Sequence, residues 1–310
     1  MARSMAPVVL CGTGNARLAA AIGESVGWPL GKSVLERFPD GELRVEIHED
    51  VRGRDVHVVQ ALGPPAEQHL LELVFLADAA RRAGARSLTA VLPYLAYARQ
   101  DRRLTGREPL GARVVAELVE GAGFERVIVV DLHSPTVEGF FGVPLEHLSA
   151  IPSIAAQLRT SSSPRVLVSP DLGGVKRAEA YARVLDLPVV VVHKSRVSGT
   201  EVTVRRVVGE VRGCAPIVVD DMISTGRTIE AAIHALIDAG CTQEITVAAT
   251  HPLFVGDAVE RLARLPIRRL VTTDTVQPPK EPPVPTRCVS VAPVIAQALR
   301  RIAGSGPSGK

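Results

Sequence analysis

The chain has 310 residues, of which 46% are hydrophobic and 22% are charged, and its formal net charge is +3. This composition is typical of globular proteins and argues against disorder, and the length exceeds what one core usually holds, so we expect two domains. No basic stretch with interleaved aromatic residues is present, which argues against nucleic acid as a partner. No apolar run approaches the roughly 20 residues of a membrane-spanning helix, which argues against a membrane protein.

Short runs of β-branched residues recur along the chain, and stretches with helical spacing separate them. Leu70, Leu73 and Ala77 keep helical spacing in the first half, as do Ile229 and Ile233 in the second. Strands that alternate with helices predict an α/β fold, and uninterrupted β-branched runs favour mainly parallel sheets flanked by helices. In chain order, the predicted strands are residues 8–10, 56–59, 88–92, 127–130, 166–168, 189–192, 217–219, 245–249 and 270–272.

The cysteines and the chain ends give a first indication of the protein's surroundings. Cys11, Cys214, Cys241 and Cys288 lie far apart with no metal-type spacing, so we expect unpaired thiols in a reducing compartment. The N-terminal residues lack the apolar core of a signal peptide. We therefore expect a cytoplasmic protein, and we expect the glycine- and serine-rich residues 304–310 to form a disordered tail.

One pattern occurs twice in the chain. A helical stretch, an Ala-Gly pair and a β-branched strand fill residues 70–94 and again residues 228–252, so that Gly84 corresponds to Gly240, 156 positions later. An Ala-Gly pair after a helix is also an ordinary helix end, so a chance similarity remains the alternative. The repeat predicts two domains of common fold that meet near residues 149–163, where small residues and prolines gather.

Residues 217–228 combine a buried strand, two carboxylates and a turn of small residues before a helix. Ligands bind at the carboxyl ends of strands in open α/β sheets, and Ser224, Thr225 and Gly226 would present backbone N–H groups to an anion at the start of the helix. Asp220 and Asp221 would repel a phosphate beside them but suit sugar hydroxyls. This arrangement predicts a sugar-phosphate site, and the alternative is an acidic strand end followed by an ordinary helix cap.

Other phosphate-binding motifs are weaker or absent. The Walker pattern GxxxxGK[ST] does not occur in the chain. The loop from Gly12 to Arg17 resembles a dinucleotide-binding loop, but arginine stands where the third glycine belongs. A dinucleotide site at this loop is therefore the less favoured alternative.

Residues 220–228 resemble the phosphoribosyl-pyrophosphate signature that type I phosphoribosyltransferases and ribose-phosphate pyrophosphokinases share. The chain is identified as similar to the pyrophosphokinases because further segments follow that family's order over nearly the whole length. Those segments are residues 38–42, 93–103, 131–133, 139–141, 168–174 and 249–252.

The resemblance implies two similar phosphoribosyltransferase-like α/β domains. We expect an N-terminal domain at residues 1–149, with the ATP side and oligomer contacts, and a C-terminal domain at residues 150–303, with the ribose 5-phosphate loop. The implied reaction transfers the pyrophosphoryl group of ATP to the anomeric hydroxyl of ribose 5-phosphate. A phosphoribosyltransferase and a non-catalytic, synthetase-like regulatory subunit are the alternatives. The resemblance also implies Mg²⁺ and self-association, with a dimer as the minimal unit and a tetramer or hexamer as the assembly.

The resemblance also assigns roles to single residues. Lys194 and Arg196 are the implied catalytic cations, and His133 and Asp171 are the implied Mg²⁺ ligands. The implied ATP-binding residues are Phe38, Asp40, Gly41, Glu42, Arg99, Gln100, Asp101 and His133, the first four in a neighbouring subunit's site. The implied ribose 5-phosphate residues are Arg196, Asp220, Asp221, Ser224, Thr225, Gly226, Arg227 and Thr228.

Each assignment has a plainer alternative. Pro39, Asp40 and Gly41 form a turn sequence in their own right, and Arg99 begins what is otherwise a solvated basic edge. A lone histidine such as His133 is usually structural, and Mg²⁺ prefers oxygen ligands. Lys194 and its neighbours are otherwise a charged strand end.

Two positions of the loop depart from the commonest form of the signature. Ser224 stands where an aspartate is usual, and Arg227 stands where a glycine is usual. Serine adds a hydrogen-bond donor near the phosphate. Arg227 would be strained if the loop required a positive φ at that position, and otherwise it adds a cation beside the phosphate.

Overall fold

The computed structural model describes residues 6–159, 164–196 and 203–304, with side chains for all of these except residues 194–196 and 203–205. The chain forms two compact units. The first unit contains residues 6–149, 275–277 and 290–304, and the second contains the described residues of 150–274 together with 278–289.

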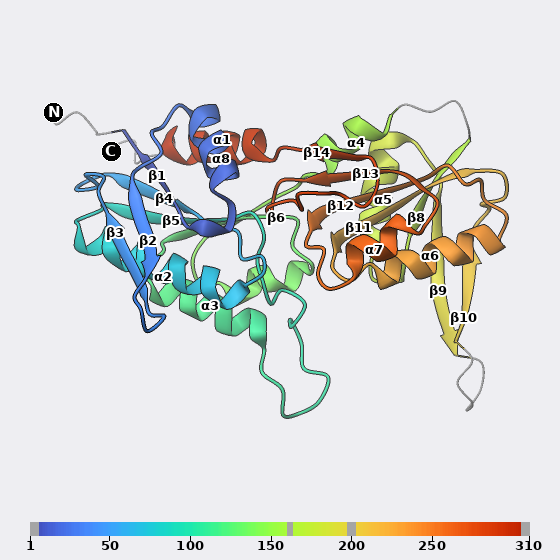
Figure 1. Ribbon diagram of the computed structural model, residues 1–310, viewed down its shortest axis with the longest axis horizontal. Coiled ribbons are helices and arrows are strands. Elements are labelled where there is room, and N and C mark those ends of the chain that lie inside the picture. The colour runs from blue at the N-terminus through green and yellow to red at the C-terminus, as the bar shows by residue number, and fades with distance from the viewer. Residues whose placement is uncertain (1–5, 160–163, 197–202, 305–310) are drawn as a thin grey trace. The chain divides into compact units, whose positions relative to one another are not determined.

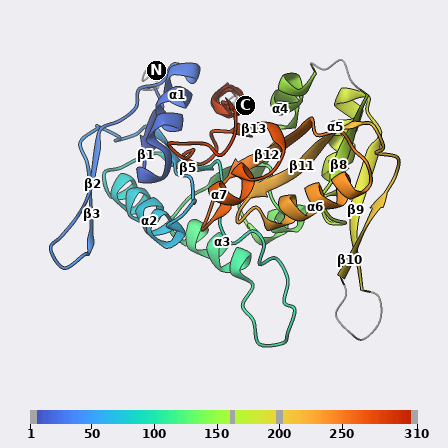
Figure 2. The same cartoon turned by 45° about the vertical axis from the view of Figure 1, so that its right-hand side comes forward.

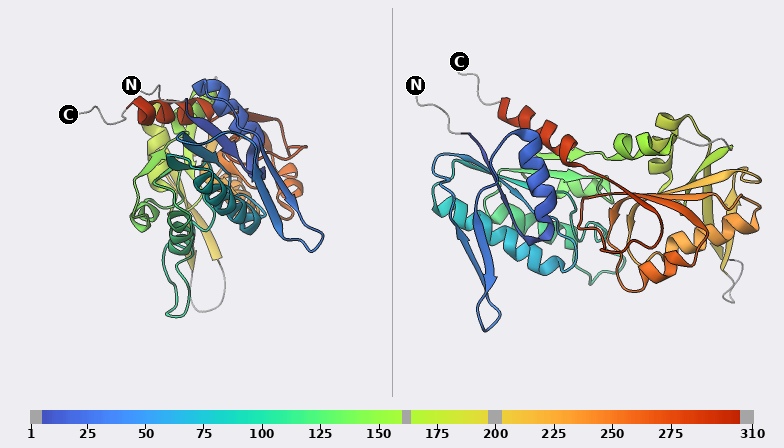
Figure 3. Two further views of the ribbon diagram at one scale, coloured as in Figure 1. Left: turned by 90° about the vertical axis from the view of Figure 1, so that its left-hand side faces the viewer. Right: turned by 45° about the horizontal axis from the view of Figure 1, so that its top comes forward.

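The first compact unit ends at Ser149 and includes the chain again at residues 290–304, whereas the sequence pattern assigned residues 150–303 to one C-terminal domain. Residues 290–304 belong to the first unit because helix α8 (Ala292–Gly304) packs against helix α1 (Ala16–Val26). Figure 3 shows the two helices side by side. Ile295 and Leu299 on α8 are completely buried, so the apolar face of α8 forms part of the core of the first unit. Residues 305–310 of the predicted disordered tail lie outside the described residues.

The first unit is built on a five-stranded parallel sheet (Figure 1). A separate antiparallel hairpin of β2 (Ser33–Arg37) and β3 (Leu43–Ile47) extends away from it, as Figure 2 shows. Helices α1, α2 (Ala66–Arg82) and α3 (Gly111–Gly121) belong to this unit. The sheet order is β1 (Val8–Cys11), β4 (Asp55–Val59), β5 (Ser87–Leu92), β6 (Arg126–Val130) and β7 (Leu145–Leu148).

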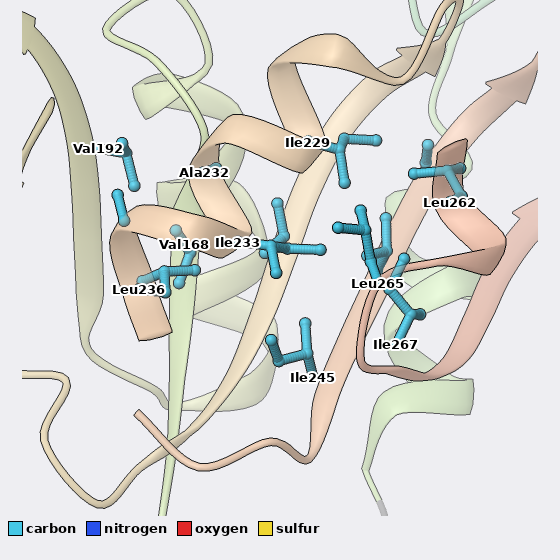
Figure 4. Packing of buried hydrophobic residues seen from close by; sticks show 14 of the residues in the cluster. Val168, Val192, Ile229, Ala232, Ile233, Leu236, Ile245, Leu262, Leu265 and Ile267 are labelled. Atoms are coloured by element: carbon cyan, nitrogen blue, oxygen red, sulfur yellow. The ribbon is translucent and has the colours of Figure 1, made fainter. Parts of the chain in front are cut away.

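The second unit is built on a seven-stranded sheet in which every pair is parallel except β9 and β10. Figure 4 shows the core in which Ile229, Ile233 and Leu236 of one helix pack onto this sheet. The helices are α4 (Ile151–Leu158), α5 (Val175–Leu185), α6 (Arg227–Asp238) and α7 (Ala258–Ala263). The sheet order is β10 (Thr203–Val208), β9 (Val189–Arg196), β8 (Arg165–Ser169), β11 (Ala215–Ile223), β12 (Ile245–Pro252), β13 (Ile267–Thr273) and β14 (Thr286–Val289).

All nine predicted strands are confirmed, and the predicted parallel α/β architecture is correct. The prediction missed β2, β3, β7, β10 and β14. These strands lie at sheet edges or in the separate hairpin, so they do not consist of the continuous apolar residues that mark a strand buried on both faces.

The internal repeat is confirmed down to single hydrogen bonds. Gly84 and Gly240 adopt φ values of +85° and +87° directly after α2 and α6. The carbonyl of each accepts a bond from a second glycine with positive φ, over 2.8 Å from the Gly53 N–H and over 2.9 Å from the Gly213 N–H. In both units the same turn therefore joins the end of the helix to the start of the preceding strand.

One buried side chain in the first unit lacks the hydrogen bonds that its polar atoms require. The His57 ring is 3% exposed and stacks on Trp28, with 4.8 Å between the ring centroids. Neither ring nitrogen has a partner within the described part of the chain. Burial lowers the pKa of His57 to about 4, against an opposing effect of the Asp55 carboxylate.

We expect this histidine to make the fold sensitive to acid. Because the pKa of His57 is lower in the folded state than in the unfolded state, the unfolded chain takes up the proton first as the pH falls below 6.5. Between pH 7 and pH 5 the protein should therefore lose about 2 kcal/mol more unfolding free energy than His57→Phe. Urea unfolding of both proteins at the two pH values measures this difference, and equal losses would contradict the prediction.

No helix among the described residues is long and apolar enough to cross a membrane.

Candidate active site

The predicted sugar-phosphate loop joins β11 to α6 in the second unit. The strand is buried from Ala215 to Val219 because it lies inside the sheet with helices on both faces. Asp220 and Asp221 stand near its carboxyl end, and residues 224–226 form the turn into α6. A strand end, a short turn and a helix start thus meet where α/β sheets bind ligands.

The peptide groups of this loop have a defined orientation. The carbonyls of Ile223 and Ser224 accept hydrogen bonds from the N–H groups of Phe254 and Val255, at 2.9 and 3.1 Å. The Thr225 carbonyl accepts a bond from the Arg261 guanidinium at 3.1 Å. None of the N–H groups of residues 225–228 donates a hydrogen bond within the described part of the chain. The loop therefore directs its carbonyls into the protein and leaves these N–H groups without a protein acceptor, as an anion site would require.

The positive φ that the loop requires falls on Gly226 and not on Arg227. Gly226 has a φ of +74° and precedes the first residue of α6, which is Arg227. A side chain at Gly226 would also contact Leu262 at 3.3 Å. Arg227 therefore adopts ordinary helical backbone and places an exposed cation at the start of α6 without strain.

A third residue neutralises part of the charge of the acidic pair. The guanidinium of Arg177, on α5, lies 3.3 Å from Asp220 Oδ1 and 3.4 Å from Asp221 Oδ1. Burial and then the neighbouring Asp221 raise the pKa of Asp220 well above its usual value, and Arg177 opposes both effects. The two carboxyl groups can therefore offer hydrogen-bond acceptors to sugar hydroxyls.

Two more predicted sites lie at the ends of β8, which pairs with β11, and of β9, which pairs with β8. Asp171 follows β8; its side chain is exposed, and its Oδ1 accepts a bond from the Gly174 N–H at 2.9 Å. Lys194 and Arg196 lie at the end of β9, where it continues past β8 as a ribbon with β10. The structure describes the backbone of these two residues but not their side chains. Because β9, β8 and β11 are adjacent and parallel, the three predicted groups follow the same edge of one sheet.

The first unit brings a second set of predicted residues together at the ends of β5 and β6. Arg99, Gln100 and Asp101 follow β5, and His133 follows β6; Arg99, Gln100 and His133 are exposed. The Thr136 hydroxyl joins the two loops by donating to Asp101 Oδ2 at 3.0 Å. Burial raises the pKa of Asp101, but hydrogen bonds from Ser134 and Thr136 outweigh it and lower that pKa.

The remaining predicted ATP residues form the turn between β2 and β3. The Phe38 side chain is 48% exposed, and Asp40, Gly41 and Glu42 are exposed too. The Gly41 N–H donates to the Phe38 carbonyl at 2.9 Å, and the Glu42 N–H donates to Asp40 Oδ1 at 3.0 Å. The turn is thus held by its own hydrogen bonds and presents an aromatic ring to solvent.

The glycine-rich loop after β1 does not have room for a dinucleotide phosphate. Both carboxylate oxygens of Glu72, which is 1% exposed, accept bonds from the Thr13 hydroxyl at 2.8 Å, and one also accepts from the Thr13 N–H at 2.9 Å. The Gly14 N–H donates to the Gln60 side chain at 3.0 Å. Burial raises the pKa of Glu72, but these bonds and others from Gln60 and Gln68 lower it overall. A carboxylate of the protein thus stands where an anion would bind, which argues against the dinucleotide alternative.

The sequence reasoning missed two arginines of the second unit. Arg177 lies in the first turn of α5, shortly after Gly173 and Gly174, and that glycine pair is a signal that could have directed attention to it. Arg261 and Thr225 are 36 residues apart in the sequence, and no local sequence pattern predicts their contact.

The structure defines the class of protein, which is an α/β protein with a candidate anion-binding loop at the end of a parallel strand. Comparison with known proteins then gives the family. The family profile of the N-terminal domain of ribose phosphate pyrophosphokinase matches residues 7–123, and that of the phosphoribosyl transferase domain matches residues 145–261. Both units are thus phosphoribosyltransferase-like domains.

Whole-chain relatives carry the same name. The ribose-phosphate pyrophosphokinase of Aquifex aeolicus is 41% identical over 95% of this chain and 95% of its own length. That of Staphylococcus saprophyticus is 41% identical over 93% of this chain and 91% of its own. The crystal structure of phosphoribosylpyrophosphate synthetase from Mycobacterium smegmatis matches with a TM-score of 0.91 and 34% identity, over 97% of this chain and all of that one. The chain belongs to the ribose-phosphate pyrophosphokinase family.

A pair of neighbouring substitutions tests where the backbone of the loop is constrained. Gly226→Ala forces a side chain into positive φ and against Leu262, so we expect it to lower the unfolding free energy by about 1–2 kcal/mol. Arg227→Ala is the matched control and should change it by less than about 0.5 kcal/mol. Thermal unfolding measures both, and a larger loss in the Arg227 variant would contradict the assignment.

Proposed function

We propose that the chain is a ribose-phosphate diphosphokinase, which transfers the pyrophosphoryl group of ATP to ribose 5-phosphate and releases AMP. The observation that carries the proposal is the loop after β11. Its N–H groups at residues 225–228 are available to an anion, and Asp220 and Asp221 stand next to them. A phosphate site beside hydroxyl-binding carboxylates matches a sugar phosphate.

In this proposal the loop holds the 5-phosphate and the acidic pair holds the sugar ring. The N–H groups of residues 225–228 bind the phosphate with the hydroxyls of Ser224, Thr225 and Thr228, and Arg227 adds a positive charge nearby. Asp220 and Asp221 bind the ring hydroxyls. The anomeric hydroxyl is thereby fixed for attack, which converts a bimolecular step into an effectively unimolecular one.

The ATP side of the reaction is assigned to the first unit. Arg99, Gln100, Asp101 and His133 bind ATP, and their position at the carboxyl ends of β5 and β6 supports this role. The turn from Phe38 to Glu42 contributes an adenine contact to a neighbouring subunit, and the exposure of the Phe38 ring is consistent with that contact. The site is complete only in an assembly, with a dimer as the minimal unit and a tetramer or hexamer as the expected form.

The residues proposed for Mg²⁺ supply few ligands, so most of its coordination would come from ATP phosphates and water. Among the described residues, no cluster of three or more histidine, cysteine or acidic side chains could hold a metal by itself. Asp171 offers an exposed carboxylate with one oxygen engaged by Gly174, and His133 is the second proposed ligand. Mg²⁺ is commonly held by one or two carboxylates with phosphates and waters, and when bound it neutralises phosphate charge.

Positioning and charge neutralisation supply the chemistry. The anomeric oxygen attacks the β-phosphorus of ATP in line, the bond from that phosphorus to the α-phosphate oxygen breaks, and AMP leaves with that oxygen. Lys194 and Arg196 stabilise the negative charge that develops on the departing AMP and on the transferred group. Their place on the β9–β10 ribbon supports this role, because β9 pairs with β8 and β8 pairs with β11.

The cytoplasmic location also belongs to the proposal. The free thiols of Cys11, Cys214, Cys241 and Cys288 are consistent with a reducing compartment.

Formation of AMP tests the reaction directly. We expect the purified protein with Mg²⁺ to release AMP from ATP only when ribose 5-phosphate is present, in a ratio of one AMP to each phosphoribosyl pyrophosphate. Chromatography of the nucleotides measures both products. AMP release without the sugar, or none with it, would overturn the proposal. A phosphoribosyltransferase would instead consume phosphoribosyl pyrophosphate with a base, and a regulatory subunit would do neither.

The role of Lys194 is tested by its removal. Lys194→Ala should lower kcat by about 10²–10³ because it removes a cation from the developing charge, while the Kd for ribose 5-phosphate stays within about threefold. Lys280→Ala, on an exposed part of the second unit, is the matched control and should retain normal turnover. Near-normal turnover of the Lys194 variant would contradict the assignment of Lys194 as a catalytic cation.

A further inference from the structure

Arg261 has an unusual position behind the phosphate loop. It lies on α7, and its side chain is only 17% exposed. Its Nε donates to the Thr225 carbonyl at 3.1 Å, its Nη1 donates to Glu230 on α6 at 2.6 Å, and its Nη2 pairs with Asp257. One guanidinium thus ties the loop, the helix that follows it and the start of α7 together.

The hydrogen bond from Arg261 to the Thr225 carbonyl fixes the orientation of the Thr225–Gly226 peptide group. An anion at the loop would approach this peptide group from the opposite side, where its N–H points. The Thr225 carbonyl belongs to the same peptide plane as the Gly226 N–H, so the two groups point in opposite directions. Arg261 holds the carbonyl, and the Gly226 N–H is thereby directed away from Arg261. The Phe254 and Val255 N–H groups hold the two preceding carbonyls in the same way.

Gly226 makes this support necessary. With a φ of +74° and no Cβ, it is the residue at which the loop could most easily rotate a peptide into another orientation. The Glu230 N–H caps the Gly226 carbonyl at 2.9 Å, so the peptides on both sides of Gly226 are held. Among these contacts, the bond from Arg261 is the one that a side chain supplies, and a substitution can remove it.

The charge of Arg261 is already balanced by Glu230 and Asp257, so its contribution to an anion site is geometric. We infer that Arg261 is a positioning residue that keeps the Gly226 N–H directed at the 5-phosphate and so sets the affinity for ribose 5-phosphate. The inference rests on the proposed function of the loop. It predicts an effect on one substrate only, because the contacts of Arg261 are with Thr225, Glu230 and Asp257 and not with a residue assigned to ATP.

Arg261→Met tests the inference because it keeps the length of the side chain and removes every donor. We expect the KM for ribose 5-phosphate to rise about tenfold, as for the loss of one hydrogen bond to a charged ligand. The KM for ATP should stay within about twofold and kcat within about threefold. Arg261→Lys keeps one donor and should give an intermediate KM. A purely structural role would lower the active fraction and kcat and leave both KM values unchanged.

Two further variants serve as controls. Asp257→Asn removes the exposed partner of Arg261 without touching the loop, so it should keep the wild-type KM values. Gly226→Ala should raise the KM for ribose 5-phosphate if the loop binds its phosphate at all. Suppose that both folded Arg261 variants keep the wild-type KM for ribose 5-phosphate and that Gly226→Ala raises it. This result overturns the inference about Arg261 and leaves the loop assignment intact. A wild-type KM in all of these variants overturns the loop assignment as well.

Discussion

The site depends on one constraint, which is the orientation of the peptide groups between β11 and α6. A backbone N–H binds an anion only if it points at the anion, and a loop of small residues does not keep such an orientation without help. Here the carbonyls of Ile223, Ser224 and Thr225 are all engaged on the side of residues 254–261. The hydrogen bonds of the protein itself therefore orient the N–H groups of the loop to the other side, which is the preorganisation that an anion site would require.

The two units share one framework, but they differ in the loop that follows the equivalent strand. Both place a strand, a helix and a second strand in one order, and both close the helix end with paired glycines. In the first unit, the equivalent loop follows β4, where Pro64 and Pro65 have no N–H and the Leu62 N–H donates to the Tyr94 carbonyl at 3.0 Å. In the second unit, the N–H groups of residues 225–228 have no protein acceptor among the described residues. The two units thus differ in the residues and hydrogen bonds of one loop rather than in their architecture.

The sequence predicted the architecture well because burial on both faces leaves a continuous pattern. The runs at residues 217–219 and 245–249 could belong only to strands inside a sheet, and both are found there. Hairpin strands β2 and β3 were missed because each has only five residues: β2 contains just two adjacent apolar residues, and β3 alternates apolar and charged residues. The packing of α8 onto α1 could not be read from the sequence, since an apolar helix face does not specify which partner covers it.

For the candidate site, the sequence pointed to the residues that are proposed to face a ligand and missed the arginines that contact them. A strand end with two aspartates followed by Ser-Thr-Gly has a local chemical logic. The contacts of Arg177 with Asp220 and of Arg261 with Thr225 instead join residues that are 43 and 36 positions apart. The same distinction explains why Arg227 is compatible with the loop. Only the position with φ of +74° excludes a side chain, and Gly226 occupies it. The signature can therefore vary at positions 224 and 227, provided that Gly226 and the residues that hold its peptides are kept.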